Sequence, residues 1–273
     1  MLTPTAELVV PGRGVGAFNV ITVEHAEAIV AGAEAAGQPV ILQISQNAVL
    51  FHHNRLAPIA AAAREVARAS SVPVALHLDH VEDMSLVEQA PDHGFGSVMY
   101  DGSKLDFAAN VAETRKAVEF CHAHGLWLES ELGEVGGKDG AHAPGVRTDP
   151  DEAAAFVRDT GVDALAVAVG SSHAMVSRDA ALDLELIGRL RAAVPVPLVL
   201  HGSSGVPDGE LTAAVRAGMT KINIGTALNI AFTGAVREYL GGNPKAVDPR
   251  KYVAPGRDAM AATVEHFLRV LNP

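Results

Sequence analysis

The sequence predicts a single-domain α/β protein, residues 1–273, built as a closed (β/α)8 barrel, also called a TIM barrel. Short apolar runs alternate along the chain with longer runs that are rich in Ala, Glu and Arg and have helical periodicity. Eight such pairs fit within a length that is usual for this barrel. The strand runs are apolar almost throughout, which indicates parallel strands covered on both faces. No linker or change in composition marks a second domain.

The predicted strands end at Gly, Pro or polar residues, and helical segments lie between them. The strands are expected at 14–20, 39–45, 73–79, 97–101, 126–133, 164–170, 197–202 and 221–225, and clear helices at 55–70, 105–124, 149–160 and 257–271. The helix at 149–160 has Thr148 or Asp149 as its N-cap and Pro150 near its first position. Residues 133–150, GEVGGKDGAHAPGVRTDP, exceed an ordinary strand-to-helix loop and predict a functional flap.

Composition excludes several classes of partner. The formal net charge is −11, and the 21 Lys and Arg residues are scattered, so we expect no nucleic-acid surface. No apolar run approaches the ~18 residues of a membrane span. One cysteine, Cys121, cannot form an internal disulfide and suits a reducing compartment. A cytoplasmic protein without a membrane or nucleic-acid partner is therefore expected.

Polar side chains gather where the predicted strands end. In a barrel of this kind, the loops at the carboxyl ends of the strands build the functional site. The residues found there are Asn19, Ser45, Asp79, His80, Asp101, Glu131, His173, His201, Asn223 and Thr226. Few of them would be favoured in an apolar core, so a site at this rim is expected.

Three histidines follow different strands and can meet at this rim. His80, His173 and His201 come after the third, sixth and seventh strands. Each one alone would be read as a hydrogen-bonded structural residue, but three imidazoles from separate elements suit a catalytic Zn²⁺ with one coordination position open. Asp79 precedes His80 and should project to a different side, where it can ligate, orient a histidine or, as we favour, move a proton. His77, on the strand face of Asp79, should line the barrel interior.

The last two strands predict a phosphate site. HGSSG, residues 201–205, and NIGT, residues 223–226, place Gly, Ser or Thr at a strand end ahead of a helix. Backbone N–H groups and hydroxyls at such positions bind oxyanions, and barrels of this type commonly hold phosphate there. Each cluster alone is more often a plain turn.

At this point the chain resembles the class II, zinc-dependent ketose-bisphosphate aldolases, the family of fructose- and tagatose-bisphosphate aldolases. The resemblance extends over nearly the whole chain, through GAFNV, LHLDH, SVMYDGS, ESELGEVGG, LVLHGSSGVPD, KINIGT and DPRKY. It implies reversible retro-aldol cleavage of a ketose 1,6-bisphosphate, most simply fructose 1,6-bisphosphate, to dihydroxyacetone phosphate and glyceraldehyde 3-phosphate, as in glycolysis. It also implies one catalytic Zn²⁺ per subunit, a monovalent cation, and a homodimer or homotetramer.

The resemblance also assigns roles to residues. It implies that His80, His173 and His201 hold the zinc, that Asp79 is the acid/base beside the carbonyl carbon of the aldehyde product, and that Asp101 and Glu131 are acids near the metal or at a second metal position. The residues implied to bind substrate or phosphate are Asn19, Ser45, Gly202, Ser204, Asn223, Thr226 and Arg250. Arg250 would meet the far phosphate, and it can act across a subunit boundary.

The sequence departs from the family pattern in several places, which include Ala227 and Asn229, where acidic and longer polar side chains are frequent. The flap reads GGKDG where GGxED is usual, so Asp139, with Glu134 as the weaker candidate, is expected to protonate the carbon next to the ketone. Ala174 stands where glycine approaches phosphate and the monovalent cation.

Alternatives stay open. Within the family, the substrate can be tagatose 1,6-bisphosphate or a phosphorylated deoxy-keto-gluconate. The chain can also be a non-catalytic sugar-phosphate-binding relative or a barrel metallohydrolase. A Schiff-base aldolase is disfavoured because Lys221 should begin the eighth strand, at the wrong end of the barrel, and Lys104 lies in a loop.

Overall fold

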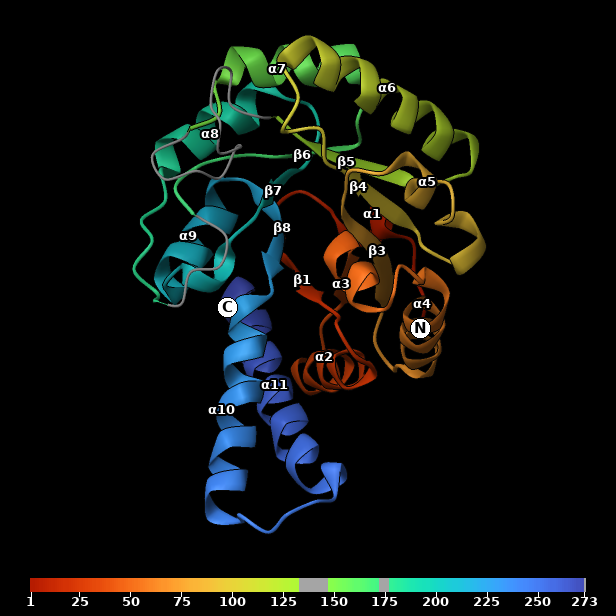
Figure 1. The fold of residues 1–273 in the computed structure, drawn as a ribbon. Coiled ribbons are helices and arrows are strands. Elements are labelled where there is room, and N and C mark those ends of the chain that lie inside the picture. The colour runs from red at the N-terminus through yellow and green to blue at the C-terminus, as the bar shows by residue number, and fades with distance from the viewer. Residues whose placement is uncertain (133–146, 172–176, 273) are drawn as a thin grey trace.

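The barrel is closed by eight parallel strands that follow one another in sequence order (Figure 1). The computed structural model describes residues 1–132, 147–171 and 177–272. Its strands are β1 (Val15–Asn19), β2 (Val40–Ser45), β3 (Val74–Val81), β4 (Ser97–Tyr100), β5 (Trp127–Glu131), β6 (Ala164–Ala166), β7 (Leu198–Leu200) and β8 (Met219–Ile224). β1 pairs with β8 as well as with β2, which closes the sheet. The predicted fold class is thus confirmed.

The described residues form eleven α-helices, and most of them cover the outside of the barrel (Figure 1). They are α1 (Thr5–Leu8), α2 (Val23–Ala36), α3 (Gln46–Phe51), α4 (Leu56–Ala69), α5 (Met84–Val87), α6 (Phe107–Ala123), α7 (Pro150–Thr160), α8 (Leu184–Ala193), α9 (Asp208–Ala217), α10 (Thr226–Gly242) and α11 (Pro249–Leu271). Of the two N-caps proposed for α7, Asp149 is the one found, because its side chain accepts from the backbone N–H groups of Asp151 and Glu152. Thr148 instead accepts from the N–H of Ala168.

One large and two small apolar clusters stabilise the molecule, the smallest of them formed by Ala164, Ala166 and Val199. The larger core lies between the outer face of the sheet and the helices, and includes Phe18, Leu42 and Leu128. A smaller apolar cluster, with Ala17 and Ile41 among its members, lies inside the barrel and also contains Leu8 of α1. Apolar residues therefore fill the amino end of the barrel, and the polar residues described below lie toward its carboxyl end.

Helices α10 and α11 form a two-helix arm that extends away from the barrel (Figure 1). α10 buries only Leu228, whereas α11 packs its carboxyl half against the barrel through residues such as Val264 and Leu268. The predicted final helix, 257–271, starts too late, since α11 begins at Pro249 with Asp248 as its N-cap. No helix among the described residues is long and apolar enough to cross a membrane.

Candidate metal centre and active site

A break in the regular geometry of β3 brings His80 to the site. Strand side chains alternate between faces, so Asp79 and His80 should point in opposite directions. The pairing of β3 with β4 shifts register between Leu78 and Val81, and His80 has a φ of 48°. A positive φ in a residue other than glycine is strained and concentrates at functional sites. The shift lets neighbouring residues of one strand both reach the carboxyl-end rim.

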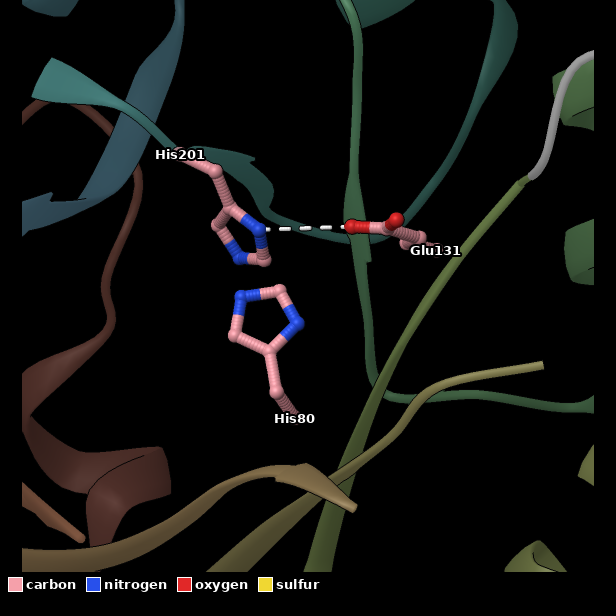
Figure 2. Close-up of side chains that lie close together, drawn as sticks. All are labelled: His80, Glu131 and His201. Atoms are coloured by element: carbon pink, nitrogen blue, oxygen red, sulfur yellow. Dashed lines mark ion pairs between the residues drawn. The ribbon is translucent and has the colours of Figure 1, made fainter. Parts of the chain in front are cut away.

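Three side chains from three strands meet at this rim (Figure 2). His80, Glu131 and His201 each offer one candidate ligand atom, and these atoms lie within 4.8 Å of one another. The rings of His80 and His201 meet edge to face with centroids 4.7 Å apart, and Nδ1 of His201 lies 3.3 Å from Oε2 of Glu131. His201 and Glu131 are buried, and His80 is partly exposed.

His80 and His201 each have one ring nitrogen that contacts a carboxylate outside the three-residue cluster. Asp101, which follows β4, lies 2.9 Å from Nδ1 of His80, and Glu129 lies 3.0 Å from Nε2 of His201. Such partners fix the tautomer and the orientation of a metal-binding imidazole. Asp101 is itself held by the backbone N–H and the hydroxyl of Ser103. Asp101 and Glu131, grouped together as near-metal acids from the sequence, therefore occupy different places: Asp101 behind His80, Glu131 inside the cluster.

The acids dominate the electrostatics of the cluster. Burial on its own lowers the pKa of His80, but the carboxylates of Asp79 and Asp101 outweigh it and raise that pKa to about 10. Burial opposes ionisation of Asp79, yet His80 and Lys221 hold the pKa of its carboxyl below the usual value. The protein thus concentrates negative charge at this rim, as a cation site requires.

The cluster fits a divalent transition metal. Two imidazole nitrogens and one carboxylate oxygen are a donor set that suits zinc and related ions, and three protein ligands are the usual number at a catalytic site. His173, the third predicted histidine ligand, lies outside the described residues, as do Asp139, Glu134 and Ala174.

A buried polar network continues below the cluster. Glu129 and Lys221 are fully buried, and the Lys221 ammonium lies 2.8 Å from Oε2 of Glu129. Lys221 also donates to Oδ1 of Asn223 at 2.8 Å. Lys221 is the third residue of β8, so the prediction that it begins the strand at the far end of the barrel is wrong. Its ammonium is buried and paired, which disfavours a Schiff-base role.

His77 lines the interior, as predicted. Its Nδ1 lies 2.8 Å from the hydroxyl of Ser97, which in turn lies 2.6 Å from the hydroxyl of Thr5. Burial, with the nearby Lys221 ammonium, lowers the pKa of His77 to about 3, so the imidazole is neutral. Its Nε2 lies 3.8 Å from both Asp79 and Glu129.

The predicted phosphate residues lie at the ends of β7 and β8. Gly202 has a φ of 68°, and Ser204 accepts a hydrogen bond from the N–H of Ala227, which joins this turn to the start of α10. Thr226 is the first residue of α10, and Asn223 is buried in β8. Backbone N–H groups at the start of a long helix favour an anion.

Three other predicted substrate residues have different surroundings. Asn19, at the end of β1, accepts from the side-chain amide of Gln43, and Ser45, at the end of β2, caps α3. Arg250 is not at the barrel mouth. It lies near the start of α11, on the arm, with 89% of its side chain exposed and its guanidinium paired with Asp248.

Sequence reasoning overlooked Glu129, and it considered Lys221 only as a Schiff-base lysine and set it aside. A signal was present, because Glu129 precedes Glu131 by two residues and Lys221 precedes Asn223 by two, and this spacing places each pair on one strand face.

Fold and site together define a barrel protein with a candidate metal centre at the carboxyl ends of its strands. A family model described as fructose-bisphosphate aldolase class II matches residues 9–273. The chain therefore belongs to the class II fructose-bisphosphate aldolase family.

Solved structures agree with this membership. The YdjI aldolase from Escherichia coli K12 is 32% identical, with a TM-score of 0.86 over 100% of this chain and 98% of that one. A putative fructose-1,6-bisphosphate aldolase from Coccidioides immitis is 31% identical, with a TM-score of 0.83 over 96% and 92% of the two chains. The fructose-bisphosphate aldolase of Campylobacter jejuni is 26% identical, with a TM-score of 0.80 over 96% and 91%. The expected enzyme class, an aldolase lyase, is supported by these matches.

Proposed function

We propose that this protein is a zinc-dependent aldolase that reversibly cleaves fructose 1,6-bisphosphate to dihydroxyacetone phosphate and glyceraldehyde 3-phosphate. The observation that carries the proposal is the meeting of His80, Glu131 and His201 at the carboxyl-end rim, with Asp79 beside them. In this proposal His173 completes the ligand set. A bound Zn²⁺ supplies Lewis acidity toward the negative charge that develops on the substrate's carbonyl oxygen.

Asp79 has the properties of the base that begins the cleavage. Its pKa lies below the usual value, with burial opposed by His80 and Lys221, so it is a carboxylate at neutral pH. Asp79 takes the proton of the C4 hydroxyl as the C3–C4 bond breaks and the aldehyde forms. We assign the return of a proton to C3 to Asp139, in the flap.

The phosphate next to the ketone binds, in this proposal, at the ends of β7 and β8. Gly202 and Ser204 supply the turn after β7, and Thr226 begins a helix of 17 residues whose N-terminus attracts an anion. Asn223 of β8 belongs to the same phosphate group of residues, and Asn19 and Ser45, the last residues of β1 and β2, would bind the sugar hydroxyls. A monovalent cation beside this phosphate is part of the proposal.

We also propose that the protein forms a homodimer or homotetramer through the two-helix arm. The arm exposes large apolar side chains, including Ile230 at 50% and Val247 at 89%, which is unfavourable in water. Arg250 lies on this arm, and it would meet the far phosphate of a substrate bound to a second copy.

Subunit complementation tests this arrangement. Asp79→Asn and Arg250→Ala are each expected to lower turnover strongly on their own. If Arg250 serves a second copy, mixing the two variants and allowing exchange restores about a quarter of the sites in a dimer, whereas independent subunits recover nothing.

One observation favours a second candidate substrate. Arg250 lies away from the mouth of its own barrel, so without the subunit contact a substrate with a single phosphate fits better. A phosphorylated deoxy-keto-gluconate is such a substrate, and tagatose 1,6-bisphosphate remains the stereochemical alternative to fructose 1,6-bisphosphate. The buried free thiol of Cys121 supports a cytoplasmic location.

A coupled assay over a panel of phosphorylated ketoses, with and without a chelator, tests substrate and metal together. We expect cleavage of fructose 1,6-bisphosphate that the chelator abolishes and Zn²⁺ restores. Cleavage that survives complete removal of metal would refute the metal assignment. Binding of sugar phosphates without any cleavage would indicate a non-catalytic relative.

A further inference from the structure

A buried ion pair lies directly behind one histidine of the candidate metal centre. Glu129 on β5 and Lys221 on β8 are both fully inaccessible to solvent, and Lys221 Nζ lies 2.8 Å from Glu129 Oε2. Removing two charges from water is unfavourable, and their attraction inside the protein often does not offset this cost. Apolar residues of similar size would fill the same space at a lower cost in folding free energy. The presence of the ion pair therefore suggests a functional role.

Glu129 is held from two sides. Its Oε1 accepts from Nε2 of His201 at 3.0 Å, while its Oε2 faces the Lys221 ammonium. The ammonium is in turn fixed by Oδ1 of Asn223 at 2.8 Å. These contacts join β5, β7 and β8 across the interior. Because each side chain is buried among strands, none can turn away without leaving a charge unpaired.

The contact determines which nitrogen His201 presents to the cluster. Carboxylates lie at both nitrogens of His201, Glu129 at Nε2 and Glu131 at Nδ1, so both nitrogens can carry hydrogen without a metal. When a cation replaces the hydrogen of Nδ1, Glu129, which can only accept, keeps the other hydrogen on Nε2. With the opposite tautomer, Nδ1 would carry the hydrogen and could not ligate. Glu129 therefore selects the tautomer that a metal needs.

We propose that Glu129 and Lys221 form a positioning pair, in which Lys221 holds the carboxylate of Glu129 so that Glu129 fixes the tautomer and the ring orientation of His201 for metal binding. The inference rests on the proposed metal role of His201. It adds two residues that touch neither substrate nor metal: Glu129 acts on the metal through His201, and Lys221 acts on His201 through Glu129.

The surroundings favour this role over simple charge balance. The Lys221 ammonium lies 2.8 Å from Oε2 of Glu129, and this positive charge favours the ionised carboxylate, which accepts from His201. Asp79 and His77 also face this part of the interior, His77 as a neutral ring. Lys221 is the only ammonium among the described interior residues, so Glu129 depends on it.

The decisive variant is Glu129→Gln. Glutamine keeps the size of the side chain, but its amide has one acceptor and two donors and cannot accept from both Lys221 and His201. With the amide oxygen toward Lys221, its NH₂ group faces His201 and favours the reversed tautomer. We expect the Kd for Zn²⁺, measured by competition with a chromogenic chelator, to rise about 10- to 100-fold. Imidazole ¹⁵N shifts of the metal-free protein should move His201 to the Nδ1–H form.

Two further variants separate positioning from charge balance. Lys221→Met should also weaken Zn²⁺ binding, and the double variant Glu129→Leu/Lys221→Met removes both charges together with the acceptor that His201 Nε2 needs, so it relieves the charge imbalance without restoring the selected tautomer. We expect the double variant to fold and still bind Zn²⁺ at least 10-fold more weakly than the wild type. Wild-type affinity in the double variant would show that the pair only balances charge, and would overturn the proposal.

Ser97→Ala is the matched control. Ser97 is also a buried polar residue of the barrel interior, but its hydroxyl contacts His77 and Thr5 rather than His201. Its Zn²⁺ affinity should stay within about twofold of the wild type, and an equal loss in this variant would refute a specific effect of Glu129. If the wild-type protein binds no Zn²⁺, the proposed function itself fails. That outcome is distinct from a loss of Zn²⁺ affinity that is seen only in Glu129→Gln, which supports the inference.

Discussion

Replacing Gly32 by alanine tests how the arm is anchored to the barrel. Gly32 lies on the buried face of α2, where a Cβ would meet Val264 Cβ of α11 at 2.7 Å and the backbone N of Glu265 at 3.0 Å. Carbon atoms normally stay about 3.5–4.0 Å apart. The two helices must therefore separate by about 1 Å, because two of the three nearest atoms, Ala261 O and Glu265 N, are helix backbone and cannot turn aside.

The expected cost follows from this overlap. Overpacking of this kind destabilises by about 1–3 kcal/mol, while alanine gains about 0.5–1 kcal/mol over glycine inside a helix. Because helix backbone takes part in the overlap, the cost lies in the upper part of its range, and the net loss is about 1–2 kcal/mol, which lowers Tm by about 2–4 °C for a chain of this size.

Scanning calorimetry of Gly32→Ala beside Gly188→Ala checks the reasoning. Gly188 lies in α8, is exposed, and has nothing within 4 Å of an added Cβ. The same substitution there should raise Tm by about 1–2 °C, because only the helix propensity changes. A Gly32→Ala protein as stable as the wild type would refute the close approach of α2 and α11.

Three further predictions concern the site. Asp79→Asn should keep the fold and the metal but lower turnover at least ~10²-fold, as expected for a positioned base; near-normal cleavage would show that another group takes the proton. Asp139→Ala should abolish exchange of the C3 proton of dihydroxyacetone phosphate in heavy water, and undiminished exchange would eliminate Asp139. Because the pKa of His80 is raised to about 10 and only its neutral form ligates, Zn²⁺ uptake at pH 6–9 must displace its proton. Zn²⁺ affinity should therefore rise about tenfold per pH unit in that range, and a flat profile in competition titrations would contradict this.

The sequence was sufficient to predict the fold because each strand carried its own signal. Runs such as PVILQIS and PVALHLD are apolar and end in polar residues, and the barrel places those residues at one rim. Asp79, His80 and His201 were found in this way, because topology alone brings strand ends together.

Other features required three-dimensional information. The turn of His80 toward the cluster depends on the register shift between β3 and β4, and no local pattern marks it. The pairing of Glu129 with Lys221 joins residues far apart in the chain, although the spacing on each strand showed which face they share. The early start of α11 had a local signal that was overlooked, since Asp248 and Pro249 repeat the Asp-Pro start of α7.

The position of Trp127 has a practical consequence for optical work on this protein. It is the sole tryptophan of the chain, and it packs against small apolar clusters inside the barrel. The fluorescence of Trp127 should change when the barrel unfolds in denaturant. Binding of metal or substrate at the carboxyl-end rim, or association of two subunits through their two-helix arms, should leave its emission little changed. An extrinsic dye on α10 would be needed to observe assembly separately from unfolding.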